Sequence, residues 1–233
     1  MIPVLAIPVL NRPDLLAQSV ATIDEPVGTL LIIDNSTELG MGDIAEDALP
    51  SCVERLVVVE PATNLGVAAS WNFAIRSYPE GWWCIANGDI AFAPGDLASL
   101  ASAVETRPDD ISCLVEFAAF GLTPTVVDRL GWFDENFVPI YYEDTDYRYR
   151  AHLEGVAVVD LPSTTRHAGS VSYRGNAHAA DNARTYPANA DYYRRKWGGD
   201  RGSERFTTPF DAGLPTSFWR LDRARLADQR WTP

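Results

Sequence analysis

Short apolar runs alternate with stretches of helical periodicity through the first half of the chain. The apolar runs predict buried strands over residues 4–9, 29–33, 55–59 and 82–86, with one or two more within residues 111–120. Between them, apolar side chains recur every three to four positions, which predicts helices from Pro13 onward, over residues 67–78 and over residues 94–106. This βαβ alternation predicts an α/β fold, with a mostly parallel central sheet flanked by helices.

The pattern changes in the second half. A helix is predicted to begin at Asp144 or Thr145 and to end at Gly155, followed by a last strand over residues 156–160. Residues 162–186 have no clear periodicity, residues 188–197 predict a helix, and the rest predicts an irregular tail anchored by Phe218 and Trp219. We therefore expect one domain over residues 1–172 and a C-terminal extension, irregular or helical, over residues 173–233.

Polar residues follow several of the predicted strands. They are Asn11-Arg12, Asp34-Asn35, Asn64 and Asn87-Gly88-Asp89. Because ligands of doubly wound sheets bind beyond the carboxyl ends of the strands, we expect these residues to line one edge of the sheet. Asn-Gly-Asp is also a good turn, but a carboxylate in that place suits Mg2+ or Mn2+. Neither a GxGxxG dinucleotide fingerprint nor a P-loop is present, so a bound phosphate would be held mainly by metal and side chains.

Residues 132–150 combine acidic and aromatic side chains at high density. The five carboxylates are Asp134, Glu135, Glu143, Asp144 and Asp146, and the seven rings are Trp132, Phe133, Phe137, Tyr141, Tyr142, Tyr147 and Tyr149. Carboxylates beside apolar rings can have raised pKa values, which favours a catalytic base. Acidic residues are also favoured in the first turn of a helix, so a structural role is the alternative. Tyr141 and Tyr142 could likewise stack on a sugar or nucleobase, or pack in the core.

Charge is distributed unevenly. Residues 1–160 hold 25 acidic and 7 basic residues (−18), whereas residues 161–233 hold 7 acidic and 12 basic residues (+5). The acidic body predicts that a divalent cation mediates any phosphate binding. The basic extension could contact a diphosphate or an anionic acceptor, or it could pack against the acidic body.

Composition narrows the class of protein. No apolar run approaches the roughly 20 residues that a membrane span needs, and the chain starts with a predicted strand rather than a basic leader. We therefore expect a soluble, cytoplasmic protein. Cys52, Cys84 and Cys113 lie far apart and beside apolar runs, which favours buried reduced thiols over metal or redox chemistry.

Over residues 3–172 the chain resembles the inverting family 2 glycosyltransferases, which have the GT-A fold. The resemblance rests on the order and spacing of residues 7–12, 32–36, 64–66, 71–72, 130–137 and 142–146, with Arg150, Gly155 and residues 167–170 after them. Asn87-Gly88-Asp89 stands where the family has its DxD-type motif. The resemblance implies a single Rossmann-like GT-A domain with a nucleotide-binding half over residues 1–92 and an acceptor half over residues 93–172.

The resemblance also implies an activity and a site. It implies a metal-dependent, inverting transfer of a sugar from a UDP- or dTDP-type nucleotide sugar to a hydroxyl acceptor, with Mn2+ or Mg2+ as cofactor. Asp144 would deprotonate the acceptor, Glu143 would orient the acceptor or donor sugar, and Asp89 would hold the metal, with His167 as a further metal or phosphate contact. The residues implied to bind the nucleotide sugar are Pro8, Val9, Asn11, Arg12, Asp34, Asn64, Gly66, Asn72, Asn87, Gly88 and Asp89.

Some alternatives stay open at the level of sequence. Asn87 replaces the first acid of the DxD-type motif, so a catalytically weak relative that binds a nucleotide sugar or glycan is the rival hypothesis. Asp34 could cap a loop and His167 could be a hydrogen-bonded loop histidine. The acceptor could be a saccharide, a lipid-linked saccharide, a protein side chain or a hydroxymethylated base in DNA. Membrane attachment, if any, would be peripheral.

Overall fold

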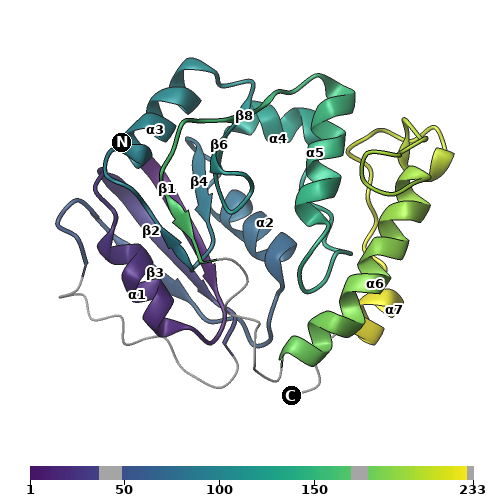
Figure 1. The fold of residues 1–233 in the computed structure, drawn as a ribbon, viewed down its shortest axis with the longest axis horizontal. Coiled ribbons are helices and arrows are strands. Elements are labelled where there is room, and N and C mark those ends of the chain that lie inside the picture. Colours follow the sequence, from purple (N-terminus) through teal and green to yellow (C-terminus); the bar gives the residue numbers. More distant parts are fainter. Residues whose placement is uncertain (37–48, 169–177, 230–233) are drawn as a thin grey trace.

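The computed structural model describes residues 1–36, 49–168 and 178–229 of the chain. Seven strands form the main sheet: β1 (Ile2–Val9), β2 (Val27–Asp34), β3 (Leu56–Val59), β4 (Trp83–Ala86), β6 (Ile111–Val115), β7 (Ala119–Leu122) and β8 (Val158–Asp160). They lie in the order β3-β2-β1-β4-β7-β6-β8 (Figure 1). Two short strands, β5 (Ile90–Ala91) and β9 (Arg166–His167), pair separately. The predicted domain boundary at residue 172, and Gly169 and Ser170 of the last matching motif, lie outside the described residues.

Most neighbours in the main sheet are parallel. β1 pairs in parallel with β2 and β4, as β2 does with β3 and β6 with β8. Strand β7 is antiparallel to β4 and β6. The predicted α/β fold with a mostly parallel sheet is thus confirmed. The apolar stretch at residues 111–120 contains two strands because the chain reverses between them, where Glu116 has a left-handed φ of 41°.

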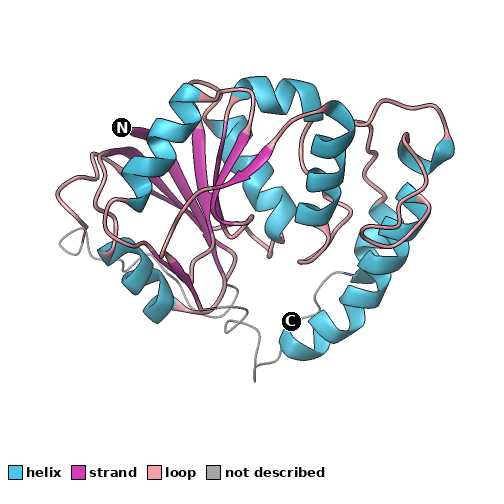
Figure 2. Cartoon of the chain, turned by 45° about the horizontal axis from the view of Figure 1, so that its top comes forward, coloured by secondary structure: helices cyan, strands magenta, loops and turns pink. Residues whose placement is uncertain are grey.

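Helices cover both faces of the main sheet (Figure 2). On one face, α1 (Pro13–Ala21) and α3 (Asp96–Thr106) pack against inward side chains of β1 such as Leu5 and Ile7. On the other, α2 (Val67–Ser77), α4 (Pro124–Leu130) and α5 (Glu143–Glu154) pack against Val4, Ala6 and their neighbours. Successive side chains of β1 therefore enter different clusters, as the alternation of a strand between two buried faces requires.

The helix that carries the acidic motif begins earlier than predicted. α5 starts at Glu143, so Asp144 lies inside its first turn and neither Asp144 nor Thr145 is the N-cap. The N-cap position is Tyr142, which has a φ of 76° and makes no side-chain capping bond. A tyrosine in this conformation has no sequence signature, which explains the error. The predicted end at Gly155 is confirmed, since Gly155 closes the helix with a φ of 65°.

The C-terminal extension contains a long helix of which the sequence pattern reveals only the second half. α6 spans His178–Trp197, whereas the prediction began it at residue 188. Its described buried side chains are Thr185, Asn189, Ala190, Tyr192, Tyr193, Lys196 and Trp197. Three of these seven side chains are polar or charged, and Pro187 lies inside the helix, so the sequence pattern indicates only the second half of α6. In Figure 1, α6 lies beside α5, on the side away from the sheet.

The rest of the extension is attached by polar contacts. After a short 3-10 turn (Pro209–Asp211), its last described element is α7 (Arg223–Gln229). Phe218 is 36% exposed, so its predicted role as an anchor is wrong, whereas Trp219 is partly buried. Instead, the side chain of Asn136 donates to the carbonyl oxygen of Arg220 and accepts from the backbone N–H of Asp222.

The structure bears on two expectations from composition: buried reduced cysteines and the absence of a membrane span. All three cysteines are free; Cys84 and Cys113 are buried, and burial raises the pKa of Cys113 to about 12. These two thiols are therefore unreactive, as the sequence predicted. None of the helices in the described part of the chain has the length and apolar content that crossing a bilayer requires.

Candidate active site

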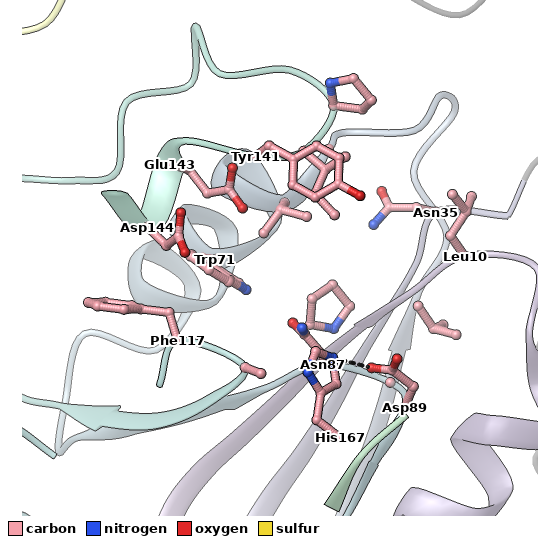
Figure 3. Close-up of a pocket in the computed structure, with 18 of the residues that line it drawn as sticks. Leu10, Asn35, Trp71, Asn87, Asp89, Phe117, Tyr141, Glu143, Asp144 and His167 are labelled. Carbon is pink, nitrogen blue, oxygen red and sulfur yellow. Dashed lines mark ion pairs between the residues drawn. The ribbon is translucent and has the colours of Figure 1, made fainter. Parts of the chain in front are cut away.

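A cavity of about 380 Å³ opens at the carboxyl ends of the central parallel strands (Figure 3). It is lined by most of the residues that the sequence selected: Pro8, Val9, Arg12, Asn64, Gly66, Asn87, Gly88, Asp89, Glu143, Asp144 and His167. Three selected residues, Asn11, Asp34 and Asn72, do not line it. The structure thus brings distant segments of the chain to one site at the sheet edge.

The end of β2 presents Asn35 to the cavity rather than Asp34. Asp34 is 1% exposed and accepts a hydrogen bond from the backbone N–H of Ser36. Asn35 lines the cavity, accepts from the N–H of Leu65 (2.9 Å) and donates to the hydroxyl of Ser70 (3.0 Å). Asn35 therefore fixes the loop before α2 to the end of β2. The sequence analysis selected Asp34 and Asn35 together. Which of the two faces the cavity depends on the direction of their side chains, which the sequence does not show.

Gly66 joins the two walls of the cavity. It has φ 78° and ψ 175°, a conformation that is essentially restricted to glycine. A Cβ at this position would lie 2.8 Å from the carbonyl oxygen of Pro139, which also accepts a hydrogen bond from the N–H of Val67. The loop before α2 and the loop before α5 can approach this closely only because residue 66 has no side chain.

Asn72 lies behind the cavity and organises the acidic loop. It is fully buried, donates to the carbonyl oxygen of Phe133 and to the carboxylate of Glu135, and accepts from the N–H of Phe133. Glu135 also pairs with Arg76 at 3.2 Å. Asn72 and Glu135 therefore connect α2 with the segment that leads to α5.

Asp89 and His167 meet on one wall of the cavity. The pairing of β5 with β9 sets Ile90 opposite His167, which places Asp89 Oδ1 3.1 Å from His167 Nε2. The hydrogen bond to Asp89 raises the pKa of His167, although partial burial opposes this. This separation is that of an ordinary hydrogen bond, in which Nε2 carries the proton; once that proton is lost, the two atoms could take adjacent positions, about 3 Å apart, around one octahedral metal ion. Within the described ranges, no three His, Cys, Asp or Glu side chains come together as a metal-binding group.

Glu143 and Asp144 lie on the facing wall, at the start of α5 (Figure 3). Glu143 is 5% exposed, and its Oε2 has no hydrogen-bond partner among the described residues. Burial, together with the charge of Asp144, raises the pKa of Glu143 well above its ordinary value. Asp144 is partly exposed and accepts from the backbone N–H of Thr145 at 2.6 Å. Two adjacent carboxyl groups in different environments can take different protonation states.

A buried ionic cluster behind this wall connects it with α6. Lys196 Nζ lies 2.8 Å from Asp134 Oδ2 and 2.7 Å from Asp146 Oδ1, and all three side chains are at most 1% exposed. Asp146 also pairs with Arg150 and accepts from the indole N–H of Trp197. The sequence did not reveal Lys196 as a site-supporting residue. A usable signal was present, because Lys196 is the only lysine in a chain with 18 arginines.

The loop before α5 is held by a second contact from α6. Asn189 is fully buried, and its side-chain amide lies 3.3, 3.0 and 3.2 Å from the carbonyl oxygens of Val138, Ile140 and Tyr141. Tyr141 and Tyr142 both have left-handed φ angles, of 80° and 76°. The extension therefore constrains the strained backbone directly before the two carboxylates.

The sheet order and the cavity at its carboxyl edge are those of the GT-A fold. The chain belongs to glycosyl transferase family 2, whose model matches residues 4–160. Among curated proteins, no match is found.

Solved structures show the same fold. The mannosyltransferase PcManGT from Pyrobaculum calidifontis, in complex with GDP-Man and Mn2+, has a TM-score of 0.61 at 17% identity, over 82% of this chain and 64% of that one. TarS from S. aureus has a TM-score of 0.56 at 13% identity, over 87% and 44%. TarS 1-349 in complex with UDP-GlcNAc has a TM-score of 0.57 at 12% identity, over 87% and 74%. The present chain thus spans less than two thirds of full TarS and of PcManGT.

Proposed function

We propose that this glycosyltransferase transfers a sugar, with inversion and with the help of a divalent cation, from a nucleoside diphosphate sugar to a hydroxyl group. One observation carries the proposal: the Asp89–His167 pair and the Asp144 carboxylate lie on facing walls of one cavity (Figure 3). If the donor diphosphate bound near Asp89 and His167, the sugar would lie between the diphosphate leaving group and the Asp144 carboxylate. This is the arrangement that a single in-line displacement requires.

The donor is proposed to be a nucleotide sugar of the UDP or dTDP type. The family resemblance supports a pyrimidine nucleotide, and the ends of β1 and β2 offer Pro8, Arg12 and Asn35 to its nucleoside. Structural neighbours were solved with UDP-GlcNAc and with GDP-Man, so the fold accepts more than one base. Arg12 also forms a 2.6 Å ion pair with Asp14, which orients its guanidinium at the rim.

Asp89 and His167 would hold Mn2+ or Mg2+, and diphosphate oxygens would supply further ligands. A cation bound there would neutralise charge that develops on the leaving diphosphate. The fit rests on the 3.1 Å separation of the two ligand atoms and on Asn87, whose carboxamide lines the same wall. PcManGT was solved with Mn2+, which supports this choice of metal.

Asp144 is proposed to accept the proton of the attacking hydroxyl. It faces the cavity from the first turn of α5 and is partly open to it, whereas Glu143 beside it is buried. A carboxylate in reach of the hydroxyl can take the proton as the new bond forms. Because Glu143 favours the protonated form, it can donate a hydrogen bond to a sugar oxygen without adding charge near the base.

A panel of nucleotide sugars tests the proposal. UDP-glucose, UDP-N-acetylglucosamine, dTDP-glucose and GDP-mannose would be assayed for binding and slow hydrolysis, with and without Mn2+. The Asp144→Asn variant should lose transfer by about 100-fold or more while it still binds the nucleotide, since general-base catalysis is worth that much. Equal activity in both forms would refute Asp144 as base. Nucleotide-sugar binding without turnover in the wild type would favour the rival function as a binding module.

A further inference from the structure

Three tyrosines from two distant segments meet at the rim of the cavity. Tyr141 lines the cavity, and its ring centroid lies 5.4 Å from that of Tyr186, on α6. The ring of Tyr142 lies 5.4 Å from the same Tyr186. Tyr186 is 47% exposed, which makes it the most exposed aromatic side chain in the part of the chain that the structure describes. An aromatic surface therefore continues from the cavity wall onto the extension.

The position of these rings is imposed by strained backbone. Tyr141 and Tyr142 have left-handed φ angles that cost about 1 kcal/mol or more each for a residue with a side chain. Asn189, one turn after Tyr186 on the same helix, holds the carbonyl oxygens on both sides of Ile140 and so supports this conformation. Such strain clusters at functional sites. In Figure 3, the ring of Tyr141 projects across the upper edge of the cavity.

The charge of the cavity favours a neutral ligand for the tyrosine rings. Four acidic residues line it, Asp89, Glu116, Glu143 and Asp144, against the basic residues Arg12 and His167. An acidic wall without a cation repels a polyanion such as DNA. A sugar ring is neutral, presents C–H groups on one face for stacking on an aromatic ring, and directs hydroxyl groups toward polar side chains.

We propose that Tyr141 and Tyr186 form an aromatic platform that binds the ring of a neutral saccharide acceptor beside Asp144. The proposal rests on the glycosyltransferase function proposed above and specifies its acceptor. Stacking on the platform would present a ring hydroxyl to the cavity, where Asp144 can remove its proton. Tyr186 belongs to the part of the chain after the family match, which ends at residue 160, so no family motif covers it.

The test compares Tyr186→Ala with Phe218→Ala, a control at another exposed aromatic side chain of the extension. Acceptor probes would be the nitrophenyl glycosides of glucose, mannose and N-acetylglucosamine, a hydroxymethylated DNA duplex and a serine-containing peptide, with each donor of the panel. For transfer to a glycoside, Tyr186→Ala should lower kcat/KM for the acceptor by about tenfold. Tyr186→Phe and Phe218→Ala should stay close to wild type. Nucleotide affinity and donor hydrolysis should not change.

Several outcomes would overturn the platform. Two concern the variant: Tyr186→Ala transfers to glycosides as well as the wild type does, or it binds the nucleotide more weakly. Two concern the wild type: it transfers only to the DNA or peptide probe, or it hydrolyses the donor without transfer to any glycoside. The failure of the wider proposal has a different signature, because the wild type would then neither bind nor hydrolyse any nucleotide sugar.

Discussion

Replacing Lys196 by Met tests whether α6 is fixed to the catalytic wall by buried charge. Methionine has a similar length but no charge, so it leaves Asp134 and Asp146 in place without the ammonium that bridges them. Asp146 keeps Arg150 at 2.8 Å. Asp134 keeps hydrogen bonds from neutral donors, the hydroxyl of Tyr192 at 2.9 Å among them. The substitution thus removes the ammonium group that pairs with the fully buried carboxylate of Asp134.

The expected loss follows from that geometry. Removing one partner of a buried ion pair costs about 3–5 kcal/mol, which is a large share of the 5–15 kcal/mol that stabilises a typical domain. Adding Asp134→Asn to Lys196→Met removes the uncompensated charge, so the double variant should be more stable than Lys196→Met alone.

Urea denaturation of the wild type, both single variants and the double variant measures these quantities. Arg195→Met is the matched control, because Arg195 forms an exposed ion pair with Asp191 on the same helix and should cost at most about 0.5 kcal/mol. The reasoning would be refuted if Lys196→Met cost no more than this control. It would also fail if the two substitutions in the double variant were simply additive.

Two further substitutions probe the cavity walls. Gly66→Ala should destabilise the fold by about 2 kcal/mol or more, because an alanine there has a strained backbone and its Cβ collides with Pro139. Gly155→Ala is the control: residue 155 also has a left-handed φ, but its surroundings are open, so the loss should be about 1 kcal/mol. Equal losses of stability in urea denaturation would contradict this reasoning. Glu143 has a raised pKa in the folded state, so its contribution to stability is present at low pH and lost as the pH rises through that value. Glu143→Gln should therefore lose less stability than the wild type between about pH 5 and pH 8, and parallel profiles would refute this.

The sequence predicts well those helices and strands whose buried faces consist of apolar side chains. The strands of the sheet and helices α1 to α3 follow apolar periodicity, and the polar residues after them gather at one edge because parallel strands end together. The start of α6 could not be predicted, since Pro187 lies inside the helix and Thr185 is the only buried side chain among the helix's described residues before it. The contact of Asp89 with His167 depends on the pairing of two-residue strands, which have no periodic signal.

The residues that complete the site come from outside the region that identifies the family. The family match ends at residue 160, yet Asn189 holds the backbone before Glu143 and Lys196 neutralises Asp134 and Asp146 from a helix that begins after that point. A chain that lacked residues 178–229 would therefore keep the site residues of the motifs while uncovering two buried carboxylates and a strained loop. For this reason we expect acceptor choice and catalytic geometry to depend jointly on residues 178–229, rather than on the family motifs alone.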